Sequence, residues 1–192
     1  MSAEGKYSVD NSNEASSDFP KNRLRAILLK LCTTVRSQTA LLQRFKEYAQ
    51  YLDVVFHSWK LLPKIINRTA FANSTFACNY LELMNVLVIS KDLQEEQKCL
   101  CSMEQPKPEM FDYSLSRRNI NRVWQSVLQC SDNMEEVVHK QMLIVLLERI
   151  IPHLDKPILL TDFLMDSLDS GGFDFSFMTI FFTNSKPSHK LN

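Results

Sequence analysis

The chain has 192 residues, 45% of them hydrophobic, and a formal net charge of zero. These values fit one folded domain or a few helical repeats, and they argue against wholesale disorder and against a nucleic-acid binder that relies on a generally basic surface. Only three glycines occur, and none lies between positions 6 and 170. Phosphate-binding loops need glycine where the backbone approaches phosphate, so the nucleotide-binding folds are nearly excluded.

The first 20 residues are polar, rich in serine and asparagine, and include acidic side chains. This composition predicts a disordered leader over residues 1–20 and argues against both a secretory signal and a mitochondrial presequence. The five cysteines are an odd number without a secretory segment, which favours reduced thiols in an intracellular protein. No apolar run approaches the roughly 20 residues that a membrane-spanning helix needs.

Apolar residues recur with the helical period through most of residues 21–172, and this pattern predicts six helices. The predicted ranges are 22–36, 39–62, 76–89, 116–130, a helix from a capping box at Asp132 and Glu135 to about Ile151, and a last helix from Asp155 to Gly171. Ile27 and Val35 are placed on the inward stripe of the first helix, and Pro63 and Pro152 are expected to end the second and fifth. The helical pattern fails over residues 90–114, which contain a charged run and two prolines, so we predict a surface loop there. The fold class is therefore all-α, with antiparallel helix pairs forming an α-solenoid fragment of the HEAT or armadillo type, although no fixed sequence period marks the repeats.

No residue pattern indicates catalysis or a cofactor. Cys99 and Cys101 are a single close pair, whereas a structural zinc site needs four ligands, so we expect no metal. The chain is accordingly predicted not to be an enzyme. Arg117, Arg118 and Arg122 share the helix at 116–130, where they could contact RNA phosphates or a partner protein, or form the solvated face of an amphipathic helix.

Three segments together resemble the CCAAT-binding-factor family. The most specific runs from Ile151 to Gly172 and has a Pro-x-Leu-x-x-Pro turn, an Asp-Phe-Leu helix and an Asp-x-Gly-Gly stop. Two upstream segments agree, the helix Leu41–Tyr48 followed by Tyr51 and Asp53, and the helix Arg122–Leu128 around Trp124. The motif residues are Phe45, Tyr48, Trp124, Pro152, Leu154, Pro157, Asp162, Phe163, Leu164, Asp169, Gly171 and Gly172.

The resemblance implies a non-catalytic helical scaffold in the nucleolus that works in ribosome biogenesis. It implies assembly with nucleolar protein 14 and other proteins of the small-subunit processome, pre-ribosomal RNA processing in the 18S and 40S branch, and at most indirect contact with pre-rRNA. Residues 173–192 do not resemble the family, so a truncated product with a non-family tail is expected. Two alternatives stay open, a generic helical adaptor that binds partner proteins and a truncated product without function.

Overall fold

The computed structural model describes residues 19–89, 91, 98–101, 107–130 and 134–155. This part of the chain contains seven α-helices and no strand, so the all-α prediction is confirmed. The helices are α1 (Lys21–Leu31), α2 (Thr39–Phe45), α3 (Leu52–Leu61), α4 (Arg68–Phe71), α5 (Ser74–Val86), α6 (Tyr113–Cys130) and α7 (Glu136–Val145).

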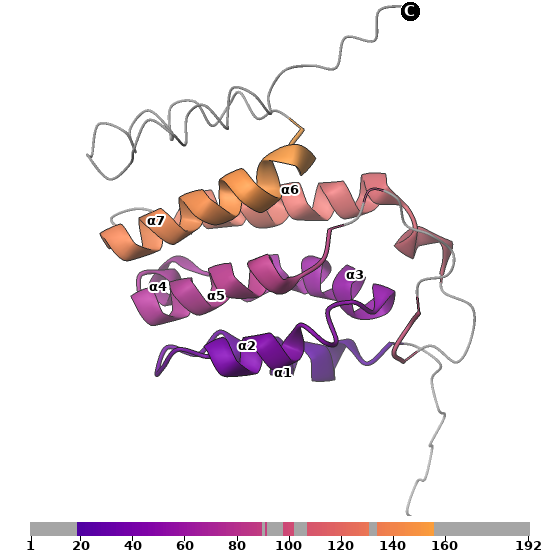
Figure 1. Cartoon of the computed structure of the whole chain (residues 1–192), viewed down its shortest axis with the longest axis horizontal. Coiled ribbons are helices and arrows are strands. Elements are labelled where there is room, and N and C mark those ends of the chain that lie inside the picture. The colour runs from indigo at the N-terminus through magenta and orange to yellow at the C-terminus, as the bar shows by residue number, and fades with distance from the viewer. Residues whose placement is uncertain (1–18, 90, 92–97, 102–106, 131–133, 156–192) are drawn as a thin grey trace, which may run out of the picture.

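The helices are arranged as three stacked pairs, the first made by α1 and α2, the second by α3 and α5, and the third by α6 and α7 (Figure 1). In one column α1 packs on α3 and α3 packs on α6, and in the other α2 packs on α5 and α5 packs on α7. The short helix α4 contacts both α5 and α6. This order gives the helix-pair stacking that the sequence predicts, while a true solenoid repeat stays a prediction.

One hydrophobic core runs through all three pairs, because each helix turns an apolar stripe toward the stack. Five different helices contribute fully buried members to it, among them Leu28, Leu42, Leu83, Met84, Val123 and Met142. Trp59 of α3 and Trp124 of α6 are both 2% exposed. A core of this kind stabilises the stack by removing apolar surface from water.

A buried asparagine joins the first pair to the second. Asn79 of α5 is 3% exposed, and its Oδ1 accepts a hydrogen bond of 2.8 Å from the backbone N–H of Gln38. Its Nδ2 donates to the carbonyls of Thr33 and Arg36, at 3.0 and 2.9 Å. One side chain thus satisfies three backbone groups of the connection between α1 and α2.

The prediction of a single helix over 39–62 is wrong, because the chain breaks between Phe45 and Leu52. Tyr51 has an extended backbone, with φ −81° and ψ 129°, and the N–H of Leu52 donates to the carbonyl of Lys98. The break lets α2 join the first pair and α3 the second. Periodicity missed it because the apolar stripe continues through both helices, with Ala49 buried inside the connection.

The first predicted helix is too long, since α1 ends at Leu31. Val35 lies beyond it and is 84% exposed, and Ile27 is 48% exposed, so neither takes the inward position expected of it. Helix α4 was not predicted; it is one turn long and is capped by the Asn67 side chain, which accepts from Ala70 N–H. A segment this short gives almost no periodic signal.

The predicted ends at the two prolines are confirmed in outline. Helix α3 ends at Leu61 and continues as a 3₁₀ turn that contains Pro63. Helix α7 widens into a π-type segment, Leu146–Ile150, and then a 3₁₀ turn with Pro152 before Leu154 becomes extended. Proline has no N–H to continue the helical ladder, which explains why neither α-helix runs on past its proline.

Two other predictions meet the structure only in part. Helix α6 begins at Tyr113, inside the predicted loop, and Pro108–Met110 form a 3₁₀ turn. Glu135 precedes α7 without a side-chain capping bond, and it accepts instead a 2.6 Å bond from the Ser74 hydroxyl. Asp132 lies outside the described residues, as do the last predicted helix, most of the leader and the tail at 173–192.

Candidate interaction surfaces

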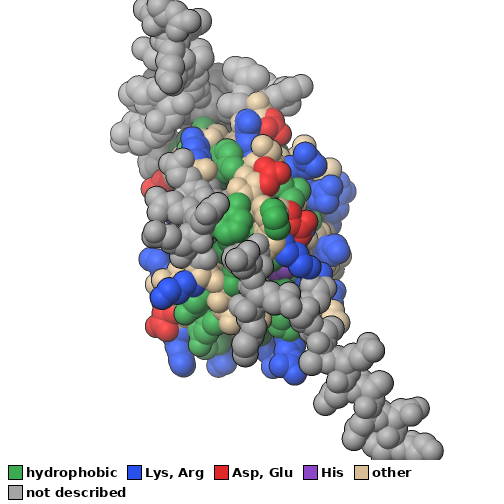
Figure 2. Space-filling model, turned by 90° about the vertical axis from the view of Figure 1, so that its right-hand side faces the viewer, with side chains coloured by type: hydrophobic (Ala, Val, Ile, Leu, Met, Phe, Trp, Pro, Cys, Tyr) green, Lys and Arg blue, Asp and Glu red, His purple; other side chains and the backbone are tan. Residues whose placement is uncertain are grey.

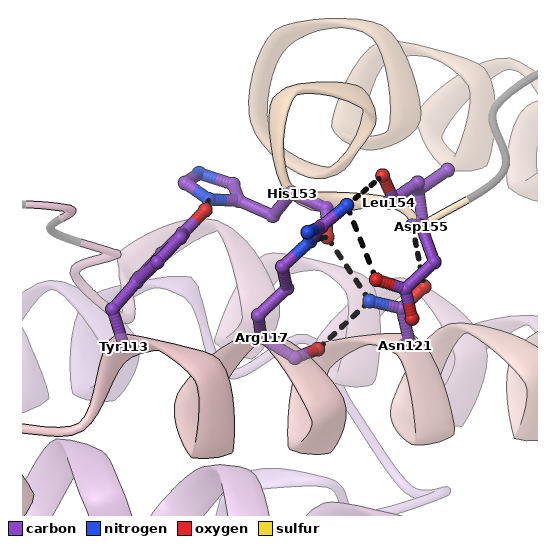
Figure 3. A network of polar contacts seen from close by, with 6 residues as sticks. All are labelled: Tyr113, Arg117, Asn121, His153, Leu154 and Asp155. Carbon is purple, nitrogen blue, oxygen red and sulfur yellow. Dashed lines mark hydrogen bonds and ion pairs between the residues drawn. The ribbon is translucent and has the colours of Figure 1, made fainter.

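The three arginines predicted as a contact patch do not act alike in the structure. Arg118 and Arg122 are exposed on α6. Arg117 instead turns toward the chain that follows α7 (Figure 3). Its guanidinium donates from Nε to the His153 carbonyl at 3.1 Å and from Nη2 to the Leu154 carbonyl at 2.8 Å.

The same guanidinium forms an ion pair with Asp155, with 3.1 Å between Nη2 and Oδ1. Asn121, one turn further along α6, donates to the His153 carbonyl at 3.0 Å and accepts from the Asp155 N–H at 3.1 Å (Figure 3). Residues 153–155 are therefore held against α6 at three consecutive backbone positions. The Arg117 guanidinium is thus occupied by contacts within the chain. Of the three arginines, Arg118 and Arg122 are the exposed ones within the described part of the chain.

His153 belongs to the same network and is buried. Its Nδ1 shares a 2.7 Å hydrogen bond with the Tyr113 hydroxyl, and Arg117, Lys91 and Arg149 lie near enough to influence it. Burial, followed by the repulsion from these three cations, lowers the pKa of His153 from 6.5 to about 4. The imidazole is therefore neutral in the folded protein at neutral pH.

Folding stability should fall as the pH decreases from about 7.5 to about 5. Above pH 6.5 the imidazole is neutral in both states, but between 6.5 and about 4 the unfolded chain binds a proton that the folded chain does not. We expect the free energy of unfolding to drop by about 1–2 kcal/mol between about pH 7.5 and about pH 5, as measured by urea titration at each pH.

His153→Gln is the matched variant for this prediction, since it removes the titration and keeps a polar side chain. Its stability should change less over the same pH range than that of the wild type. Parallel pH profiles in the two proteins would assign the acid sensitivity to other groups.

A second polar anchor lies at the start of α3, where Asp53 is 1% exposed. Its Oδ1 accepts from Leu100 N–H and its Oδ2 from Cys101 N–H, each at 2.9 Å. The carboxylate thus fixes the segment of the two close cysteines, Cys99 and Cys101. Burial and the nearby negative charge of Asp53 raise the pKa of both thiols, which favours the uncharged form that binds metal poorly.

Five residues of the predicted motif lie in the described part of the chain, and three of them are buried. Phe45, Trp124 and Leu154 are buried, whereas Tyr48 is 48% exposed and Pro152 is exposed. Phe45 and Tyr48 line an apolar groove beside α1 with a volume of about 640 Å³. The remaining motif residues lie outside the described part of the chain: Pro157, Asp162, Phe163, Leu164, Asp169, Gly171 and Gly172.

Asn79 and Arg117 are the important residues whose roles sequence reasoning missed. Asn79 stands in an otherwise apolar stretch of the helix, and this placement is the one signal that could have indicated a buried polar anchor.

Among the described residues, no group of three or more histidine, cysteine or acidic side chains is placed to hold a metal ion. Nor does this part of the chain contain a helix with the length and hydropathy of a membrane span.

Comparison with known proteins gives relatives of one kind. Nucleolar complex protein 4 homolog B of Xenopus laevis is 29% identical over 188 residues, which cover 88% of this chain and 33% of that protein. Homolog A of the same organism is 27% identical over 177 residues, covering 88% of this chain and 33% of that protein. The Homo sapiens homolog is 23% identical over 176 residues, with 88% and 34% covered.

No family model matches the chain, and no solved structure matches it. The chain spans about a third of the length of these curated relatives. These relatives confirm that the chain resembles homologues of nucleolar complex protein 4.

Proposed function

We propose that the chain is a non-catalytic helical scaffold of the nucleolus that works in ribosome biogenesis. The observation that carries this proposal is the similarity to nucleolar complex protein 4 homologues along 88% of the chain. The stacked helix pairs support it, because such stacks present long surfaces that suit the binding of other proteins. The exposed side chains on α6 are part of such a surface.

The finer form of the proposal places the chain in the small-subunit processome. There it would bind nucleolar protein 14 and other processome proteins, support the 18S and 40S branch of pre-rRNA processing, and touch pre-rRNA only indirectly. Arg118 and Arg122 are the residues of the predicted patch that remain available for a partner. Arg117 is proposed to act through its internal contacts, by holding residues 153–155 in place.

The test is to express the full chain with a fluorescent affinity tag in cultured vertebrate cells. We expect enrichment in nucleoli and recovery of nucleolar protein 14 and 18S precursor RNA with the purified chain. Diffuse fluorescence with recovery of chaperones alone would reject the proposal for this chain, whatever its longer relatives do.

The chain offers a matched pair of control variants. Val127 of α6 is fully buried, whereas Val137 of α7 is 67% exposed. Val127→Asp places an unpaired charge in the core and should abolish nucleolar enrichment by unfolding the chain. Val137→Asp makes the same chemical change at the surface and should leave the fold intact.

A further inference from the structure

An apolar groove lies beside α1, and charged side chains line its border. Its apolar wall includes Leu24, Ile27, Leu31, Leu41 and Phe45. Ile27 is 48% exposed and Leu41 45% exposed, so large apolar side chains of both α1 and α2 face the solvent here. A volume of about 640 Å³ lies in the range of natural binding pockets.

The border of this groove is basic. Arg23, Lys30 and Arg44 line it and are exposed, and none of the three forms an ion pair with another described residue. Residues 21–46 contain seven lysines and arginines and no aspartate or glutamate, although the whole chain has zero net charge. Figure 2 shows Lys and Arg side chains at the lower end of the molecule, which α1 and α2 form in Figure 1, with hydrophobic side chains between them.

The apolar wall and the basic border together restrict which ligand can bind in the groove. A second copy of the chain that used the same face would bring the same positive segment against the first and would be repelled. Single-stranded RNA would need exposed aromatic faces for stacking, but Phe45 is 6% exposed and Phe19 already stacks on His57 at 4.3 Å between ring centroids. Only Tyr48 of these aromatic rings is substantially exposed.

We infer that the groove between α1 and α2 binds an amphipathic helix with an acidic polar face from a partner protein. The apolar side of that helix, with anchors spaced three and four residues apart, would occupy the groove against Ile27 and Leu41. Its aspartates and glutamates would lie beside Arg23, Lys30 and Arg44 and would set the orientation and the association rate. The inference concerns binding by the purified chain and does not depend on a nucleolar role.

The test is fluorescence anisotropy of the full chain with a labelled synthetic peptide of about 18 residues. The peptide carries leucine and phenylalanine at positions i, i+3, i+4 and i+7 and glutamate on the opposite face. We expect saturable binding that weakens as the salt concentration rises. A peptide with lysine in place of each glutamate should bind at least about tenfold more weakly.

Two variants of the chain separate the contributions of charge and apolar contact. The triple variant Arg23→Glu, Lys30→Glu and Arg44→Glu should lose about tenfold or more in affinity for the acidic peptide and should favour the lysine peptide. The double variant Ile27→Ser and Leu41→Ser should weaken both. The side chains concerned are exposed or about half exposed, so both variants should stay folded, which thermal unfolding of each variant checks.

The matched control is Lys64→Glu with Lys140→Glu, which changes exposed charges of the same kind outside the groove. It should leave peptide affinity unchanged. Equal binding of the acidic and lysine peptides, or unchanged affinity in the serine variant, would overturn the inference. Competition by single-stranded RNA through Arg23, Lys30 and Arg44, with no effect of the serine substitutions, would show a nucleic-acid surface and would overturn it too.

Discussion

Asp53→Asn should destabilise the chain by about 2–3 kcal/mol, although the two side chains have nearly the same shape. The two carboxylate oxygens accept from two different backbone N–H groups, those of Leu100 and Cys101. Asparagine offers one acceptor, so its amide N–H₂ would face the second N–H. The variant also removes a negative charge from the first turn of α3, where it is favourable.

The measurement is the midpoint of thermal unfolding, which should fall by about 5–10 °C for a chain of this size. Asp112→Asn is the control, because Asp112 is exposed and accepts from Ser114 N–H at the start of α6, a position where asparagine serves equally well. A loss of stability of the same size in both variants would contradict the special role of the buried carboxylate.

Leu100 and Cys101 also line the groove beside α1, so Asp53→Asn should weaken binding of the acidic peptide as well.

Asn79→Ala is expected to have a comparable or larger effect, lowering the free energy of unfolding by about 2–4 kcal/mol. It leaves the N–H of Gln38 and the carbonyls of Thr33 and Arg36 without their side-chain partner in a buried site. Asn79→Asp should be no better, since a carboxylate oxygen would then face two carbonyls.

Urea titration measures this effect, and Asn22→Ala provides the comparison. Asn22 is an exposed residue of α1, and its replacement should change stability by no more than about 0.5 kcal/mol. If Asn79→Ala were as mild as Asn22→Ala, the three hydrogen bonds would contribute little net stability. The attachment of the first pair would then depend on apolar packing alone.

The all-α class and the succession of most helices could be predicted because each long helix buries one stripe with a period of 3.6 residues. The break before Leu52 could not, since a connection that buries Ala49 continues the stripe of the helices it joins. Side-chain partners distant in sequence were also beyond reach. Arg117, Arg118 and Arg122 look alike as a basic cluster, and only the path of the chain after α7 shows that one of them binds backbone carbonyls.

The stacking of the three pairs has a consequence for any unfolding experiment on this protein. The chain has two tryptophans, Trp59 in the middle pair and Trp124 in the third, and the first pair has none. Since each pair packs mainly on its neighbours, the first pair could detach while the environments of both indole rings change little. Tryptophan fluorescence would then report a higher midpoint than far-ultraviolet circular dichroism, which records the loss of helix in every pair. Agreement of the two signals would establish that the three pairs unfold as one unit.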